Sequence, residues 1–152
     1  MDNLKLSQGG SFALTAGGLA EGTNANTYKT VNTITYVIDG VFKSKGATDN
    51  VAFTAGHGTV PVSSSVLYLI CLDGSGNFST VAGRAVPTAE VTGGFRALEW
   101  PAVPADVAAV GGLRVDTNAS TTFTPGSVDL GAAGITDTYY DLFAVPTKPL
   151  TA

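Results

Sequence analysis

The sequence predicts an all-β fold, an antiparallel β-sandwich or a small β-barrel with an extended, glycine-rich N-terminal arm. Short runs rich in β-branched and aromatic residues recur along the chain, and turn signals such as Asp-Gly and Pro-Gly separate them. No segment shows a sustained hydrophobic period of 3.6 residues, the pattern typical of amphipathic helices. The 152 residues are expected to form one β domain over 30–152, preceded by the arm over 1–29.

The arm is the first expected element. Its glycines, five in all, are Gly9, Gly10, Gly17, Gly18 and Gly22. Each glycine costs a helix about 1 kcal/mol relative to alanine, and the few apolar side chains are insufficient for an independent core. The arm therefore either docks onto its own domain or a neighbour, or is a flexible terminus without a role. The apolar side chains through which the arm could dock are Leu4, Leu6, Phe12 and Leu14.

Two β-hairpins follow. Asp39-Gly40 lies between β-forming runs, which favours a type I′ turn because both central residues then adopt positive φ. Alternation places Ile34, Tyr36 and Ile38 on one face of the first hairpin. The near-continuous apolar run over 65–72 predicts a fully buried strand, which a turn over 73–77 connects to a return strand over 78–86.

The remaining elements are shorter or less regular. A short strand is expected over 51–53, and the prolines at 87, 101 and 104 indicate loop or sheet edge, because proline cannot donate to a central ladder. The segment 107–115 is expected to be a strand with a bulge at Gly111-Gly112, or to contain one helical turn in its alanine-rich part. Closing strands are expected over 121–124 and 138–145.

The charge composition narrows the possible partners. Only 13% of residues are charged, and 8 basic against 12 acidic side chains give a net charge of −4, which argues against a nucleic-acid partner. No apolar run reaches the roughly 20 residues of a membrane span, and the first residues lack the apolar core of a signal peptide. Synthesis in the cytoplasm is therefore expected. A surface with so few charges is prone to association, so a homo-oligomer is predicted.

Few residues offer chemistry. His57 lies in a glycine-containing loop without a local nucleophile or carboxylate that would give it a catalytic role. Cys71 falls inside the most apolar run, where a buried, unreactive thiol is expected. The turn over 73–77 departs from a calcium loop at its sixth and twelfth positions, Phe78 and Arg84. The sequence thus predicts no catalytic, metal or cofactor site and no enzyme activity.

Three aromatic residues are candidates for a binding surface. Trp100 is a possible interface residue, and a sugar-binding hypothesis would choose it together with Tyr139 or Tyr140. Consecutive residues of a strand point to opposite faces, so only one of the two tyrosines can line a given surface. Packing in the core or at a subunit interface is the favoured interpretation of all three.

Three segments together resemble structural proteins of tailed-bacteriophage virions, especially capsid decoration (cement) proteins. The segments are SVLYLICLDGSGNFSTVAG over 65–83, GGLRVDT over 111–117 and TFTPGSVDLGAAGITDTYYDLFAVP over 122–146. The resemblance implies a non-enzymatic protein on the outer surface of the virion capsid, commonly a trimer, that binds the major capsid protein and stabilises contacts between capsomers.

The arm would then act as a clamp, because an extended segment can add to an exposed sheet edge while its apolar side chains fill pockets. The residues expected to make this capsid or subunit contact are Leu4, Leu6, Phe12 and Leu14. A different class of function remains open at this point. The protein could be a head-fibre or tail-associated module that binds a host glycan through Trp100 or a tyrosine.

Overall fold

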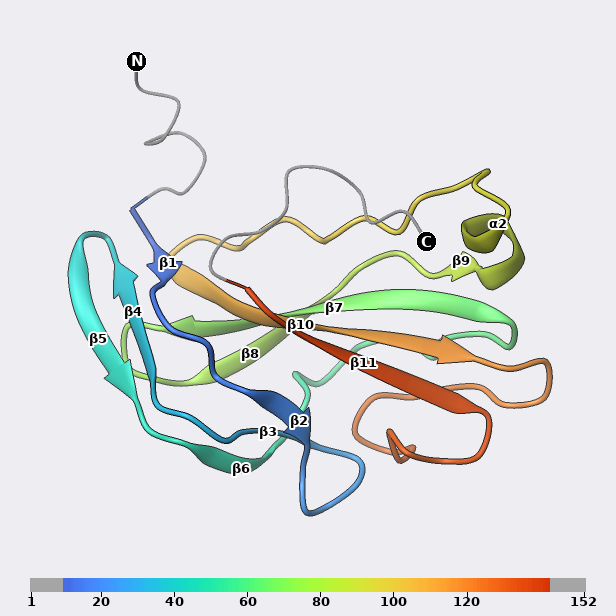
Figure 1. The fold of residues 1–152 in the computed structure, drawn as a ribbon, viewed down its shortest axis with the longest axis horizontal. Helices are drawn as coiled ribbons and strands as arrows, with labels where there is room; N and C mark the ends of the chain where they lie inside the picture. The colour runs from blue at the N-terminus through green and yellow to red at the C-terminus, as the bar shows by residue number, and fades with distance from the viewer. Residues whose placement is uncertain (1–9, 143–152) are drawn as a thin grey trace.

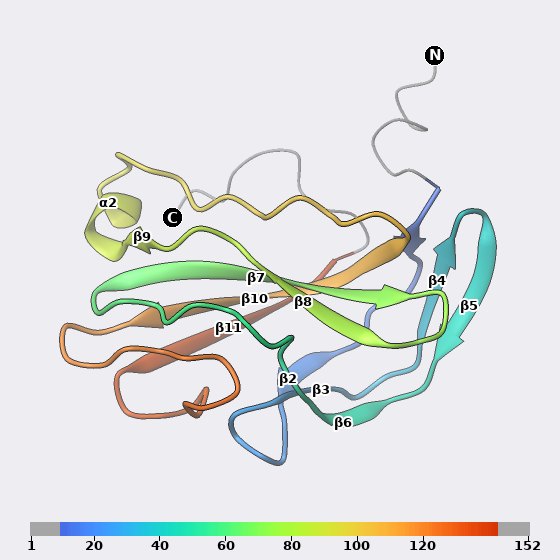
Figure 2. The same cartoon turned by 180° about the vertical axis from the view of Figure 1, so that it is seen from behind.

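The computed structural model describes residues 10–142, and these residues form an all-β sandwich (Figures 1 and 2). The all-β prediction is confirmed. Among the described residues, no helix has the length and apolar character that crossing a membrane requires.

The chain contains eleven labelled strands and one labelled short helix in the described range. They are β1 (Phe12–Ala13), β2 (Leu19–Glu21), β3 (Tyr28–Thr30), β4 (Ile34–Ile38), β5 (Val41–Lys45), β6 (Thr48–Val51), β7 (Ser64–Asp73), β8 (Phe78–Ala82), β9 (Val86–Pro87), α2 (Thr88–Thr92), β10 (Val107–Thr117) and β11 (Ile135–Asp141).

These strands form three antiparallel sheets. The large sheet has the order β11-β10-β7-β8, and β9 also pairs with β7. The two small sheets have the orders β1-β4-β5 and β2-β3-β6. Both small sheets lie on one side of the large sheet, with β1-β4-β5 at one end of the molecule (Figure 1).

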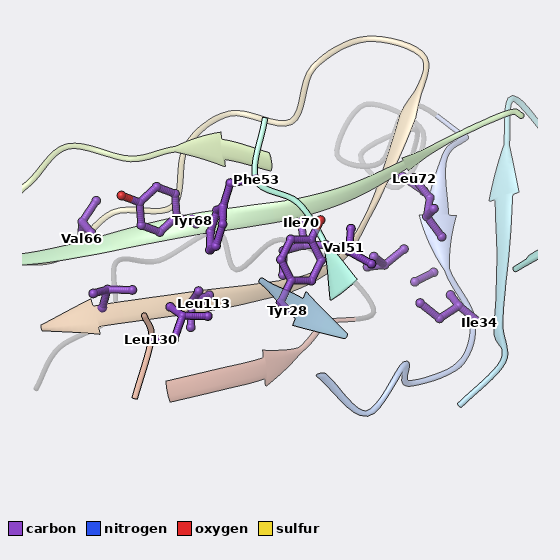
Figure 3. Close-up of a cluster of buried hydrophobic side chains, with 14 of the residues drawn as sticks. Tyr28, Ile34, Val51, Phe53, Val66, Tyr68, Ile70, Leu72, Leu113 and Leu130 are labelled. Carbon is purple, nitrogen blue, oxygen red and sulfur yellow. The ribbon is translucent and has the colours of Figure 1, made fainter. Parts of the chain in front are cut away.

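The main core fills the space between the large sheet and the small sheets (Figure 3). Its aromatic rings meet edge to face, with ring centroids 5.5 Å apart for Tyr28 and Phe53, 5.5 Å for Phe53 and Tyr68, and 6.3 Å for Tyr68 and Phe123. Each such pair contributes about 0.5–1.5 kcal/mol beyond the apolar area that it buries. The core therefore links β3, β7 and the loops that follow β6 and β10.

The opposite face of the large sheet is covered by residues 88–104, which we call the cover segment. Val91 and Leu98 of this segment pack on Leu67 of β7, and Trp100 packs near Leu69 and Cys71. Strand β7 is consequently buried on both faces, which explains why its sequence is apolar at nearly every position. The expectation of a fully buried strand over 65–72 is confirmed.

The described part of the expected arm belongs to the sheets. Strand β1 pairs with β4, β2 pairs with β3, and the expected boundary at residue 30 falls inside β3. The carboxylate of Asp141 accepts a hydrogen bond from the Gly18 N–H at 2.9 Å. Leu19 lies so close to Gly111 that a Cβ at Gly111 would be 2.1 Å from its Cδ1. From Gly10 onward, this segment therefore docks onto its own domain.

The predicted first hairpin turn is confirmed. Asp39 and Gly40 have φ values of 48° and 80°, as a type I′ turn requires, and they connect β4 to β5. The expected strand over 107–115 is β10, which continues through Thr117. It contains a bulge, but the register against β7 shifts between Ala109 and Gly111, just before the predicted position at Gly111-Gly112.

Other sequence expectations are wrong in detail. The strand expected over 51–53 is β6, which ends at Val51, and 121–124 forms only an isolated bridge between Phe123 and Val60. The last described strand is β11, which begins at Ile135, three residues before the expected start at 138, and ends at Asp141; residues 143–145 of the expected strand lie outside the described residues. The proline-rich stretch contains the short helix α2, with Pro87 at its start, where a missing N–H costs no helical hydrogen bond. These differences depend on long-range pairing, which local patterns do not specify.

Candidate interaction surface

The sheet β1-β4-β5 has an apolar outer face. Residues directly opposite each other in antiparallel strands point to the same side, and the register joins Phe12 to Val37 and Val37 to Phe42. Their neighbour Tyr36 points into the main core, so this row points away from it. We call Phe12, Val37 and Phe42 the open face.

The residues of the open face and its surroundings differ in exposure. Val37 is only 4% exposed between its two aromatic neighbours, whereas Phe42 is 72% exposed. Leu14, which follows β1, is 40% exposed. A large aromatic side chain left in water at the edge of a sheet is a typical feature of an interaction surface when it adjoins other apolar residues.

Strand β1 is held against β4 and the turn that follows it by hydrogen bonds at both of its ends. The Gly40 N–H donates to the Gly10 carbonyl at 3.1 Å, and the Asp39 N–H donates to the Ser11 hydroxyl at 3.1 Å. The Leu14 N–H donates to the Thr35 carbonyl at 2.8 Å. The first hairpin and the end of the expected arm therefore form one surface.

The structure thus brings together part of the predicted contact set. Phe12 and Leu14 lie at β1, while Leu4 and Leu6 lie outside the described residues. Sequence analysis missed Val37 and Phe42. A signal for them was present, since a two-residue turn at Asp39-Gly40 pairs 37 with 42, on the face opposite Tyr36.

Trp100 packs against its own domain and is not the exposed side chain that a glycan-binding role would require. It is half-buried, with its ring over Gly112 and edge to face with Tyr140 at 5.8 Å between centroids. Tyr139 points to the other side of β11 and packs on the main core. The two tyrosines therefore lie on opposite faces, as the strand pattern predicts, and Trp100 packs within its own domain.

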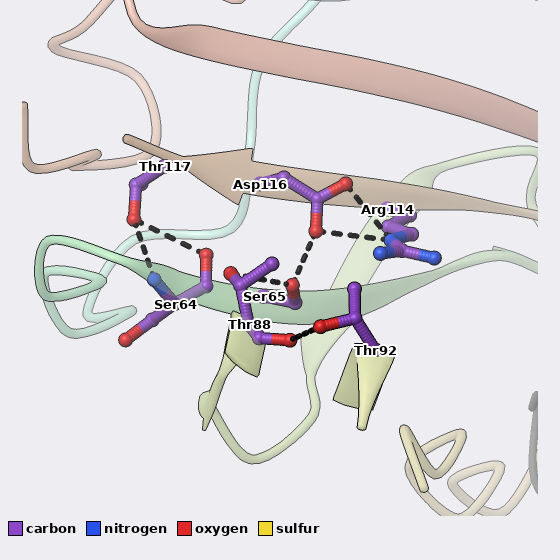
Figure 4. A network of polar contacts seen from close by, with 7 residues as sticks. All are labelled: Ser64, Ser65, Thr88, Thr92, Arg114, Asp116 and Thr117. Carbon is purple, nitrogen blue, oxygen red and sulfur yellow. Dashed lines mark hydrogen bonds and ion pairs between the residues drawn. The ribbon is translucent and has the colours of Figure 1, made fainter. Parts of the chain in front are cut away.

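A polar network fixes the cover segment at one end of the large sheet (Figure 4). The Ser65 hydroxyl lies 3.1 Å from the Thr88 hydroxyl and also contacts the Asp116 carboxylate. Arg114 pairs with Asp116 at 2.9 Å between Nε and Oδ2. Because these groups satisfy one another in a partly buried setting, we assign the network a structural role.

The residues considered for chemistry occupy structural positions. His57 is half-buried, with Nε2 2.8 Å from the Thr80 hydroxyl oxygen and its ring tilted against Tyr68. Cys71 is fully buried, and burial raises the pKa of its thiol to about 12. At neutral pH the thiol is therefore protonated and a poor nucleophile.

The turn over 73–77 is organised by its first residue. The Asp73 carboxylate accepts hydrogen bonds from the Asn77 N–H at 2.9 Å, the Asn77 side-chain amide at 2.9 Å and the Ser75 N–H at 2.8 Å. These bonds, chiefly those from Asn77, lower the pKa of Asp73. The carboxylate is thus used to close a hairpin turn.

Metal coordination has no candidate in the described part of the chain, where no group of three or more His, Cys, Asp or Glu side chains is suitably placed.

Comparisons with models of protein families, with curated proteins and with solved structures found no match to this chain. The open face is therefore the candidate functional site, on physical grounds.

Proposed function

We propose that this protein is a non-enzymatic capsid decoration protein of a tailed bacteriophage that binds the outer capsid surface through its open face and stabilises contacts between capsomers. The observation that carries the proposal is the exposed Phe42 beside Phe12 and Val37 on a rigid sheet. The resemblance of three sequence segments to virion structural proteins selects the partner, which is the major capsid protein.

A small apolar contact suits a partner that is present in many copies. Each aromatic side chain buries about 150–250 Å² when it is fully covered, which is modest for one interface. A capsid lattice offers repeated sites, and an oligomer that engages several of them gains effective affinity from linkage alone. A homotrimer is proposed as the binding form, in which weak contacts by each subunit add up.

The low charge of the chain supports the same function. With 13% charged residues, the protein has little electrostatic steering, so a partner surface must be matched mainly by shape and apolar contact.

Co-sedimentation with capsids tests the proposal. Source-phage capsids, stripped of loosely attached proteins, are mixed with wild type, Phe42→Ser or Phe95→Ser, and the copies bound per particle are counted. Phe95 is the matched control, because it is 86% exposed but follows α2 and lies away from the open face (Figure 1). We expect wild type and Phe95→Ser to saturate at a fixed ratio to the major capsid protein, and Phe42→Ser to bind at least about tenfold more weakly.

The proposal is contradicted if wild type does not bind capsids. It is also contradicted if Phe42→Ser and Phe95→Ser bind capsids equally well. The predicted contribution of Leu4 and Leu6 is tested in the same assay with the double variant Leu4→Ser and Leu6→Ser, which is expected to bind fewer copies. Sedimentation equilibrium of the free protein tests the trimer.

A further inference from the structure

Strand β5 is the edge of the sheet β1-β4-β5. Among the described strands it pairs with β4. Val41 lies opposite Ile38 at one end of this pairing, and Lys45 lies opposite Ile34 at the other. Along its other side, alternate residues of an edge strand present unpaired N–H and C=O groups, to which another extended chain can bind. The open face ends at this edge with Phe42.

The two faces of β5 differ in chemistry. Phe42 and Ser44 share the outer face with Val37 and Thr35, whereas Lys43 and Lys45 share the inner face with Tyr36 and Ile34. Both lysines are half-buried. A strand added to this edge would therefore meet Phe42 and Ser44 on the outer side, and on the inner side Val41 together with two positive charges.

The lysines have no carboxylate partner in the described part of the chain. The ion pairs there are Arg96–Glu90 and Arg114–Asp116. The ammonium group of Lys45 lies 5.7 Å from the centre of the Phe78 ring, and Asp39 lies in the turn at the far end of β5. Two positive charges on alternate residues of an otherwise acidic protein select a negatively charged partner.

We propose that β5 is a docking edge for an extended segment of a partner protein with alternating acidic and apolar residues. Its carboxylates lie beside Lys43 and Lys45, its apolar side chains extend the row of Val37 and Phe42, and its backbone continues the sheet. A second copy of β5 fits poorly, because the lysines of both copies would lie on the same face of the joined sheet. The assignment rests on the proposed function in one respect, since it places the segment in the capsid.

A peptide titration tests the assignment independently of any capsid. Full-length, isotope-labelled protein is titrated with the capped peptide Thr-Glu-Val-Glu-Val-Thr and, as a matched control, with Thr-Lys-Val-Lys-Val-Thr. We expect amide shifts and slowed hydrogen exchange across Val41–Lys45 with the acidic peptide, and binding about fivefold tighter than that of the basic peptide. The double variant Lys43→Glu and Lys45→Glu is expected to reverse this preference.

Several results would overturn the assignment. They are equal binding of the two peptides, absence of shifts at β5, and shifts at β5 caused by raising the protein concentration alone, which would indicate self-pairing. Protection of β5 amides that disappears when residues 1–9 are deleted would also overturn it, because the edge would then bind a segment of its own chain.

The capsid assay separates this inference from the proposed function. If the peptides behave as expected but wild type does not bind capsids, the proposed function fails and the docking edge stands. If capsids bind wild type and the double variant Lys43→Glu and Lys45→Glu equally, the docking edge fails as a capsid contact and the proposed function stands.

Discussion

The outer faces of the two layers of the sandwich differ in whether the chain itself covers them. The outer face of the large sheet, with Leu67, Leu69 and Cys71, is covered by the cover segment and excludes water. The outer face of the sheet β1-β4-β5 carries Phe12, Val37 and Phe42, and Phe42 is left 72% exposed. One apolar face is thus buried by the chain itself, and the other remains accessible to a partner.

This difference indicates where stability and binding reside. Covering an apolar face contributes about 25 cal/mol for each Å² removed from water, so residues beneath the cover segment contribute to folding. Phe42 contributes little to folding while it is exposed and can contribute the same kind of free energy to binding. Substitutions on the two faces should therefore have opposite consequences for stability and for association.

The largest expected effect concerns access to Cys71 on the covered face. Its thiol is buried and protonated at neutral pH, so alkylation requires opening of the cover segment or of the whole domain. We expect labelling by iodoacetamide at about pH 8 to be at least about a thousandfold slower in the native protein than in the chain unfolded in guanidinium. Mass spectrometry of timed samples measures both rates. Native labelling at a rate close to that of the unfolded chain would mean that this face is not effectively covered.

The same substitution on the two faces gives the next largest effect. Leu98 is a buried residue of the cover segment that packs on Leu67, so Leu98→Ala removes packed methyl groups and is expected to cost about 3 kcal/mol of unfolding free energy. Leu14 is 40% exposed, and Leu14→Ala is expected to cost less than about 1 kcal/mol. Urea unfolding of both variants measures the two losses, and similar values would remove the distinction between the faces.

A glycine beneath Trp100 provides a smaller, steric test. A Cβ at Gly112 would lie 2.1 Å from two atoms of the Trp100 ring, so Gly112→Ala is expected to displace the ring and destabilise the fold by about 1–3 kcal/mol. Gly74 is the control, because it lies in an exposed turn where a Cβ would have no neighbouring atom within 4 Å. Gly74→Ala is expected to be neutral within about 0.5 kcal/mol in the same thermal unfolding experiment. The Trp100 fluorescence maximum should shift to longer wavelength only in Gly112→Ala.

The all-β class, the first hairpin and the buried strand were predictable because their signals are local. Asp39-Gly40 determines a turn by its φ values, and the apolar run of β7 determines a strand by its length and composition. Strands β1 and β2 gave no such signal. The glycines beside them indicated flexibility, whereas the Gly18 N–H donates a hydrogen bond to Asp141 and Leu19 of β2 packs closely on Gly111 of β10.

The candidate site was predictable only in part for the same reason. Phe12 and Leu14 were identified by their apolar character in a glycine-rich segment, but their neighbours on the surface come from the first hairpin. Phe42 and Phe12 belong to one open face because β4 pairs with both β5 and β1, and β1 is distant from β4 in the sequence. Trp100 was suggested as an interface residue because it is aromatic, and its position over Gly112 depends on the path of the cover segment.

The smallest expected effect on stability belongs to the residue that is most important to the proposed function. Phe42→Ser removes a side chain that is largely in water, so the unfolding free energy should change by no more than about 0.5 kcal/mol. Serine also has only a modest β propensity, and the loss is kept small because Phe42 lies on an edge strand. Urea unfolding of this variant, compared with its capsid binding, separates folding from association. A loss of several kcal/mol would show that Phe42 belongs to the core of the domain, and the open face would then be a folding surface like the face beneath the cover segment.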